Sequence, residues 1–417
     1  MPTRAERWHG GLLVAMAALI PIGEGLSMAA LVGVLVLLVV RRREVQLRVL
    51  RESPTFGVVA GLGAWLAAGL LAIVLGGEGW QKPDEIGRWL PFLAIPAVAL
   101  SAPMLPERTL RLAVRAFVAA LAVACLFGLV QYAFNIRPGE SISRVDSTIA
   151  TQGRIPGRFG ETVAGGFYYH RLKMAHVLVV GLALAASRQL FAALTLRRRL
   201  VEGALLALMG ATFLLTYTRG ALVALAVGGF ACLPFLTRRV RLAAMLGLAL
   251  AAGVVLAIPS VRARVMSIGS DQASAVRSLI WSQGVRIIAD HPLGTGLGNY
   301  IVVVNRYYDA ADPAFTVRTY PHNVFLAAWA EAGPVGLVGW VVAWLSLVVA
   351  CGRALWRRKS PFGDDAVAAG VGLLGIVAML FIGLTHDVLF HNAVAMAFSA
   401  MVGGVLAFLG RAPASPA

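Results

Sequence analysis

Long apolar runs recur along the whole sequence, and they constrain the fold more than any other feature. Many approach 20 residues, the length at which an α-helix crosses the hydrocarbon core of a bilayer. Hydrophobic residues make up 59% of the 417 residues and charged residues only 14%, which is too little charge to cover a soluble domain of this size. The sequence therefore predicts an all-α polytopic integral membrane protein.

The apolar runs predict about twelve transmembrane helices. Their expected positions are 11–23, 26–40, 55–76, 88–104, 112–134, 174–194, 201–217, 220–236, 242–259, 333–352, 366–385 and 392–410. Arginine-rich turns follow the even-numbered runs, and short loops of this kind mark the cytoplasmic side, so both termini are expected there. Only PIGEGLS separates the first two runs, which fits two short spans or one long broken helix. The N-terminal arginines favour two spans.

Two long segments face the outside in this arrangement. In the second, apolar positions recur at helical spacing from Val276 to Ile288, and the glycine-rich HPLGTGLGNY then ends the pattern. We expect a folded lid that is amphipathic enough to lie on the bilayer surface. Three regions follow: 1–259, with transmembrane helices 1–9 and an outer loop at 135–173; 260–321, a large helical outer loop; and 322–417, with an outer helix and transmembrane helices 10–12.

The outer segments carry many arginines, although outer loops are usually poor in them. The first segment contains Arg154 and Arg158, and the second contains Arg277 and Arg286, among others. A solvated surface balanced by aspartates is one interpretation, because the charge rule binds long loops less strictly. An anionic ligand is the other, because clustered fixed cations attract phosphate and guanidinium groups bind it bidentately. The set as a whole favours the anionic ligand, and Lys82 in the first definite outer loop is a further candidate phosphate contact.

Two positively charged or titratable residues stand at expected membrane edges. Arg219 lies between two apolar runs with almost no loop, where a charge is usually functional, a snorkelling anchor being the alternative. His322 follows a proline and opens a run with helix boundary signals, HNVFLAAWAEAG. The positive end of a helix dipole favours the neutral imidazole, which suits a general base. A capping or interfacial histidine is the alternative.

Three other polar residues are expected near His322. Tyr320 and Asn323 flank it in the sequence and are candidate substrate contacts. Asp387 closes the eleventh predicted span at the same outer level, where it would orient a histidine, pair with an arginine, or simply be a loop carboxylate. The remaining histidines are less readable from the sequence: His170, His176, His291, His386 and His391.

Several common catalytic motifs are missing from the sequence. It contains no H-E-x-x-H, no metal-binding Cys/His spacing, no phosphate-binding P-loop and no G-x-S-x-G. Nucleotide hydrolysis is therefore not indicated, and neither a metal nor a cofactor is expected. The three cysteines lie inside apolar runs and are expected to be packing residues.

Taken in order, these motifs resemble the O-antigen ligase family, whose relatives include O-antigen polymerases and O-linked oligosaccharyltransferases. The resemblance rests on TYTRGAL at a membrane edge, RSLIW at 277–281, HPLGTGLGNY at 291–300 and HN-x-x-L-x-x-x-x-E-x-G-x-x-G at 322–336. It is densest over 200–352, and the twelve-span layout extends it over the whole chain. It implies a GT-C-like glycosyltransferase that works without a metal on the periplasmic face of the bacterial inner membrane.

The resemblance also implies substrates and roles. The donor would be O-antigen polysaccharide on undecaprenyl pyrophosphate, and the acceptor a hydroxyl of the lipid A–core oligosaccharide, with membrane lipid but no nucleic acid as a partner. The family's essential histidine corresponds to His322 and its essential arginines to Arg219 and Arg277. An acidic residue of the family corresponds less closely to Asp387, and GRIPGRFGE, with Arg154 and Arg158, matches only loosely.

The chemistry implied by the resemblance is an attack of a sugar hydroxyl on an anomeric carbon, with the histidine as base and arginines stabilising the pyrophosphate as it leaves. A single displacement would invert the anomeric centre, and no carboxylate pair suggests a covalent intermediate. An O-antigen polymerase or a protein O-oligosaccharyltransferase would use the same donor. A transporter of an anionic lipid or metabolite is the alternative from another class, but it predicts charges near the bilayer midplane, and the predicted spans are almost free of charge.

Overall fold

The computed structural model describes residues 3–51, 54–76, 79–136, 162–168, 170–257, 272–307, 320–358 and 362–410, with 259, 262, 266 and 360. These residues form helices and connecting turns, and no β-strand occurs among them. The α-helices are α1 (Arg4–Leu19), α2 (Glu24–Val40), α3 (Thr55–Leu75), α4 (Ala94–Ser101), α5 (Glu107–Phe134), α7 (Arg171–Phe191), α8 (Leu196–Leu214), α9 (Arg219–Cys232), α10 (Arg238–Ala257), α12 (Gln272–Asp290), α13 (Tyr300–Val303), α14 (Val324–Arg357), α15 (Asp364–Gly383) and α16 (Asn392–Leu409). Short 3₁₀ turns include η2 (Pro83–Arg88) and η8 (Val388–Phe390).

The predicted membrane-helix character is confirmed. Seven helical stretches of the described chain are long and apolar enough to span a membrane, namely Thr55–Leu75, Pro83–Met104, Glu107–Phe134, Arg171–Phe191, Val324–Arg357, Asp364–Gly383 and Asn392–Leu409. Glu24–Val40 and Arg219–Phe235 are shorter apolar helices. The other predicted runs lie on α1, α8 and α10, so each of the twelve has a helical counterpart, but the count of twelve spans stays a prediction. Residues 11–40 form two helices, α1 and α2, as expected.

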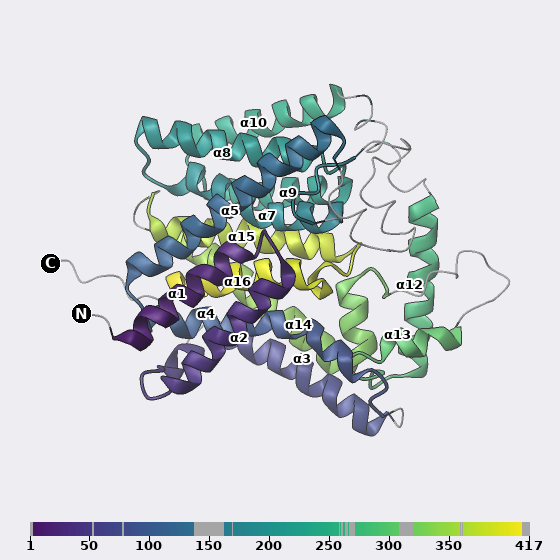
Figure 1. Ribbon diagram of the computed structural model, residues 1–417. Coiled ribbons are helices and arrows are strands. Elements are labelled where there is room, and N and C mark those ends of the chain that lie inside the picture. The colour runs from purple at the N-terminus through teal and green to yellow at the C-terminus, as the bar shows by residue number, and fades with distance from the viewer. Residues whose placement is uncertain are drawn as a thin grey trace.

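The helices form one bundle with a distinct end (Figure 1). α14 packs along α3, and α15 packs against α7, α9 and α14. α12 and α13 lie across one end of the bundle, and α1 begins on the opposite side. The predicted amphipathic helix at 276–288 is present as part of α12. Its Ile280 and Ile287 are buried as expected, whereas Val285 faces away from the bundle and is exposed.

Facing glycines bring α3 and α14 into close contact. A Cβ atom on Gly61 would lie 2.5 Å from the carbonyl oxygen of Gly339, and one on Gly339 would lie 2.6 Å from the carbonyl oxygen of Gly61. In a membrane the surrounding lipid is as apolar as the helices, so association depends on close packing, which small residues allow. The two glycines therefore set the distance between the two helices.

An aromatic core fills the space beside this crossing. The ring of Trp65 lies 4.4 Å from that of Trp89 and 4.8 Å from that of Trp340, and the ring of Phe390 lies 5.0 Å from Trp89. Buried aromatic pairs in such edge-on arrangements add about 0.5–1.5 kcal/mol each beyond their area. Phe390 follows Asp387 by three residues, so the core also fixes the segment that carries this carboxylate.

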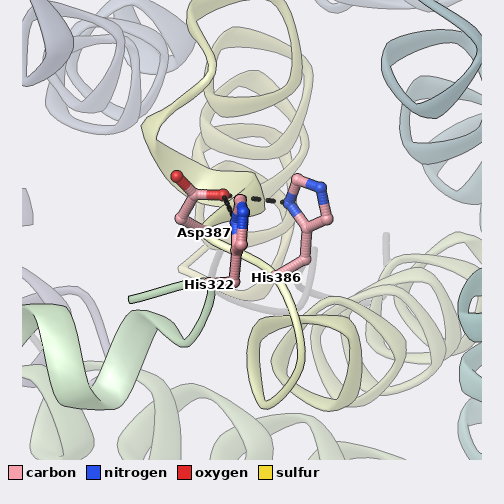
Figure 2. A group of neighbouring side chains, drawn as sticks. All are labelled: His322, His386 and Asp387. Atoms are coloured by element: carbon pink, nitrogen blue, oxygen red, sulfur yellow. Dashed lines mark hydrogen bonds and ion pairs between the residues drawn. The ribbon is translucent and has the colours of Figure 1, made fainter. Parts of the chain in front are cut away.

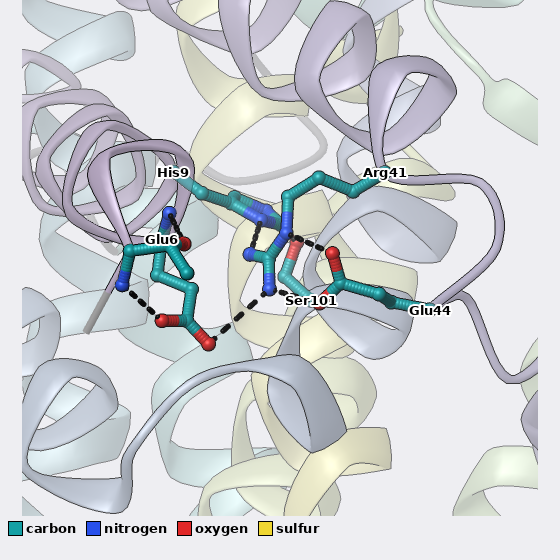
Figure 3. A network of polar contacts seen from close by, with 6 residues as sticks. Glu6, His9, Arg41, Glu44 and Ser101 are labelled. Atoms are coloured by element: carbon teal, nitrogen blue, oxygen red, sulfur yellow. Dashed lines mark hydrogen bonds and ion pairs between the residues drawn. The ribbon is translucent and has the colours of Figure 1, made fainter. Parts of the chain in front are cut away.

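A buried polar network joins α1, α2 and α4 on the side where α1 begins (Figure 3). Arg41 is 4% exposed, and its guanidinium lies 3.0 Å from Nδ1 of His9 and 2.5 Å from a carboxylate oxygen of Glu44. Nε2 of His9 lies 2.8 Å from Oγ of Ser101. Because a guanidinium only donates, Nδ1 of His9 accepts and its Nε2–H donates to Ser101. One arginine of the predicted cytoplasmic charge cluster is thus a structural anchor between three helices.

Replacing Gly61 by leucine tests the helix crossing. The new side chain would meet the backbone of α14, and we expect the free energy of unfolding to fall by about 1–3 kcal/mol. The measurement is the apparent Tm and the folded yield of detergent-purified protein. Gly63→Leu on the same helix is the matched control, since a Cβ there meets no atom within 4 Å. Equal loss in both variants would contradict the assignment.

Candidate functional site

His322 lies just before the helix that it was expected to open. Asn323 is the N-cap of α14, and its Oδ1 accepts hydrogen bonds from the backbone N–H groups of Phe325 (2.9 Å) and Leu326 (3.1 Å). The capping role therefore belongs to Asn323, whose amide oxygen is already engaged. His322 has a φ of 47°, in the left-handed region, which directs its ring away from the first turn of α14.

The ring of His322 meets Asp387, on the connection between α15 and α16 (Figure 2). Nδ1 of His322 lies 3.0 Å from Oδ1 of Asp387, which is 6% exposed. Burial by itself raises the pKa of Asp387, but the contacts with His322 and His386 hold it well below its ordinary value. An ionised carboxylate only accepts hydrogen bonds, so His322 donates its Nδ1–H to Asp387.

Four other histidines gather around this pair. The ring of His386 lies 5.2 Å from that of His322 and 5.5 Å from those of His176 and His391, and the ring of His391 lies 6.4 Å from that of His170. Burial lowers the pKa of His391 to about 4 and that of His170 to about 3, so both are neutral at neutral pH. Five of the seven histidines of the chain thus share one cluster.

The clustering could not be read from the sequence, because these histidines come from three separate segments. His170 and His176 lie at the start of α7, His322 precedes α14, and His386 and His391 flank η8. A signal that the sequence analysis did not use is the placement of several of these histidines next to the ends of apolar runs.

The start of α9 carries Arg219 to the same end of the bundle. A Cβ atom on Gly220 would lie 3.9 Å from Oγ1 of Thr385, so the first turn of α9 packs against the residues before His386 and Asp387. Tyr217, with a φ of 54°, makes the tight turn between α8 and α9. Arg219 and Asp387 were expected at the same height along the bundle, and this packing agrees with that expectation.

Arg277 lies on α12, which covers the same region. Gly284 of α12 lies against Pro321 and Leu326, where a Cβ atom would be 3.7 Å and 3.8 Å from their side chains. Arg277 is seven residues earlier on α12, two helical turns away on the same face. The helix therefore presents Arg277 on the side that faces the His322 segment.

Arg88 is a cation near the site that the sequence did not single out. Its guanidinium lies 3.9 Å above the ring of Tyr320 and forms an ion pair with Glu85. Tyr320 is 4% exposed, and its ring stacks on that of Tyr300 at 5.6 Å. Burial raises the pKa of Tyr320, so it stays a neutral phenol. The predicted outer loop thus contributes Arg88 rather than only Lys82.

The other predicted cations lie at more exposed positions or outside the described residues. Lys82 lies 3.8 Å from Asp84 and is partly exposed, and Arg286 is exposed on α12. Neither makes a described contact with the histidine cluster. Arg154 and Arg158 lie outside the described residues.

The glycine-rich loop 291–300 holds the outer part of α14 in place. α14 is kinked at Gly333, which has a φ of 63°, and the following Pro334 has no N–H to donate to the carbonyl of Ala330. The N–H of Thr295 donates to that carbonyl at 2.8 Å instead, and the N–H of Gly298 donates to the buried carboxylate of Glu331 at 3.1 Å. The loop therefore replaces the helix hydrogen bond that Pro334 cannot make and holds the part of α14 that follows His322.

The same side chains offer metal-ligating atoms. One donor atom each from His322, His386 and Asp387 lies within 4.8 Å of the others. Spacing motifs in the sequence gave no sign of such a group, because 64 residues separate His322 from His386. The sequence prediction that the protein needs no metal stays a prediction.

The fold and the site define a helical membrane protein whose buried histidine–carboxylate cluster and cationic side chains gather where several apolar helices begin or end. Residues 204–341, about a third of the chain, match the family model described as O-antigen ligase. No curated protein matches the chain. The match includes Arg219, Arg277 and His322, and Asp387 lies beyond it. This match supports membership in the O-antigen ligase superfamily.

The buried histidines predict an acid-sensitive stability that His170→Asn reduces. Nδ1 of His170 accepts the N–H of Leu172 as the N-cap of α7, and its pKa falls from 6.5 to about 3 on folding. Between these values the unfolded chain binds a proton that the folded chain does not, so stability falls as the pH drops below 6.5. Asparagine keeps the cap but does not titrate.

The measurement is the apparent Tm at pH 7.5 and pH 5.0. We expect the loss of Tm on acidification to be smaller in H170N than in the wild type, and unchanged in the control His291→Asn. Identical losses in wild type and H170N would show that His170 does not carry this dependence.

Proposed function

We propose that this protein is a glycosyltransferase that transfers O-antigen polysaccharide from undecaprenyl pyrophosphate to a hydroxyl of the lipid A–core oligosaccharide. The site would face the periplasm in the bacterial inner membrane. The family match supports this class of reaction. The single observation that carries the mechanism is the 3.0 Å contact between Nδ1 of His322 and the buried carboxylate of Asp387.

In this mechanism His322 is the general base. Its Nε2 takes the proton of the acceptor hydroxyl while the hydroxyl oxygen forms a bond to the anomeric carbon. The bond from that carbon to the pyrophosphate oxygen breaks, and undecaprenyl pyrophosphate leaves with the electron pair. Asp387 fixes the tautomer and stabilises the imidazolium that forms. One displacement inverts the anomeric centre.

The leaving pyrophosphate needs positive charge that is already in position. Arg219 and Arg277 are the proposed donors: the start of α9 packs against Thr385, and Arg277 shares a face of α12 with Gly284, which lies against Pro321. A guanidinium binds a phosphate group through two parallel hydrogen bonds. Arg88, held against Tyr320 by its contact with the ring, is a further cation for the donor or its sugar. No step of this scheme is assigned to a metal ion.

A polymerase or a protein O-oligosaccharyltransferase would share this site and the donor, and would differ only in the acceptor. A transporter is disfavoured by a specific observation: the sequence of α15 after Asp365 and that of α16 contain no charged residue. A polar substrate path would need such groups near the bilayer midplane.

The decisive experiment is a transfer assay with purified protein in nanodiscs, lipid-linked donor, lipid A–core acceptor and EDTA. We expect ligated lipopolysaccharide to form. A second lipid-linked chain and a pilin-type protein serve as competing acceptors. Transfer only to a lipid-linked chain would assign a polymerase, and no transfer to any acceptor would refute the proposal.

Asp387→Asn tests the base assignment. An amide no longer fixes the Nδ1–H tautomer of His322, and the imidazolium loses its counter-charge, so we expect the transfer rate to fall about 10²-fold or more. His322→Ala should lose as much, and the double variant should lose little more, since the two residues act as one unit. Additive losses in the double variant would contradict the pairing. Gel filtration and the apparent Tm report whether each variant is folded.

Substitutions of Arg219 test the charge assignment. We expect Arg219→Gln to lower the transfer rate about 10²–10³-fold, and Arg219→Lys to lose less because it keeps the charge without the bidentate geometry. Arg197→Gln is the matched control. Arg197 lies in the first turn of α8, whereas Arg219 follows the last turn of that helix. An unchanged rate in R219Q would remove Arg219 from the site.

A further inference from the structure

The histidine cluster contains more imidazole nitrogens around Asp387 than a general base requires. Three imidazole nitrogens lie within 4 Å of one oxygen, Oδ1 of Asp387: Nδ1 of His322 at 3.0 Å, Nδ1 of His386 at 3.1 Å and Nε2 of His391 at 3.8 Å. A base needs only one orienting carboxylate, which His322 already has. Nδ1 of His386 helps to keep Asp387 ionised, but neither it nor Nε2 of His391 exchanges a proton in the transfer reaction proposed above.

The distances from these nitrogens to Oδ1 are near those within a tetrahedral ligand set. Ligands about 2.0–2.1 Å from a zinc ion in tetrahedral geometry are about 3.3 Å from one another. The three distances to Oδ1 lie on either side of this value, and the donor atoms of His322, His386 and Asp387 lie within 4.8 Å of one another, so a bound ion draws them together. Nδ1 of His386 is buried and makes no aligned hydrogen bond, although it is 3.1 Å from Asp387. This nitrogen is therefore a metal-ligating atom that already lies beside the carboxylate (Figure 2).

We propose that His322, His386 and Asp387 bind one Zn²⁺ ion, with His391 completing the coordination, and that the bound ion inhibits the enzyme. The inhibitory part rests on the proposed function, whereas the binding part does not. Imidazole nitrogens with one carboxylate suit zinc and similar transition metals, whereas Mg²⁺ and Ca²⁺ prefer ligand sets made of oxygen. The side chain of His322 is 29% exposed, which gives an ion access to the cluster from outside.

Zinc and the base reaction need opposite tautomers of His322. Catalysis needs the proton on Nδ1 and a free lone pair on Nε2. A zinc ion at Nδ1 needs the lone pair there, so the proton moves from Nδ1 to Nε2 and the neutral ring has no acceptor left. The carboxylate of Asp387 is also taken up by the ion. Binding therefore switches off the base without a net release of protons from this ring.

The binding test is calorimetric titration of ZnCl₂ into metal-free, full-length protein in detergent. We expect one ion per chain for the wild type and at least a tenfold weaker affinity for His386→Gln. His291→Gln, on the loop at the end of α12, is the matched control and should bind as the wild type does. MgCl₂ should give no saturable heat. Equal zinc affinity in the wild type and H386Q would overturn the site.

A spectroscopic readout separates ligation from misfolding. Co²⁺ in place of Zn²⁺ should give the visible absorption of a tetrahedral site in the wild type and in H291Q, and not in H386Q of unchanged apparent Tm. A six-coordinate spectrum, or the same bands in H386Q, would contradict the ligand set. His386→Asn serves as a second variant if H386Q does not fold.

The inhibition test is separate from the binding test. Added ZnCl₂ should stop glycan transfer at the concentrations that saturate binding, and EDTA should restore it. Saturated zinc binding with unchanged transfer would overturn the inhibition but leave the site. If the protein transfers no glycan at all, the proposed function fails, and the calorimetric and spectroscopic results still decide the metal site.

Discussion

A buried, ionised carboxylate is the interaction on which the end of the bundle around His322 depends. Removing Asp387 from water is unfavourable unless donors surround it, and the donors come from the residue before α14 and from the connection between α15 and α16. Each of these segments must therefore keep its position for the carboxylate to stay charged. In return, the carboxylate accepts a hydrogen bond from Nδ1 of His322 and so fixes the orientation of its ring.

Packing between the apolar helices supports this arrangement. Gly61 and Gly339 let α3 and α14 touch through their backbones, and the tryptophan core beside them ends at Phe390, three residues from Asp387. The kink at Gly333 and Pro334 then changes the direction of α14 between His322 and the crossing with α3. Near the kink, the backbone carbonyls of Ala330 and Glu331 accept hydrogen bonds from the N–H groups of Thr295 and Gly296, so the loop that resembles a family motif has a direct structural task.

Much of the site could be predicted, but for different reasons at different residues. His322 and Arg219 stood out because a polar residue beside an apolar run is costly, and the structure brings the segments of both to the same end of the bundle. The break before the tenth predicted span follows from the Gly333–Pro334 pair and is present. Arg88 was missed because nothing in its local sequence distinguishes it from other loop arginines. Only the structure shows its contact with the ring of Tyr320. Asn323 caps α14, which local sequence rules alone could have suggested.

The sequence by itself determined that the chain folds as apolar helices and that its polar chemistry lies at their ends. Both follow from the low solubility of charge and of unpaired backbone groups in hydrocarbon, which acts on each segment independently of the others. Only the tertiary structure decided which ends meet. His170, His176, His322, His386 and His391 are spread over three segments, and their gathering around one carboxylate depends on how α7, α14, α15 and α16 pack. Helix packing sums many weak contacts between distant residues, so no local pattern in the sequence encodes it.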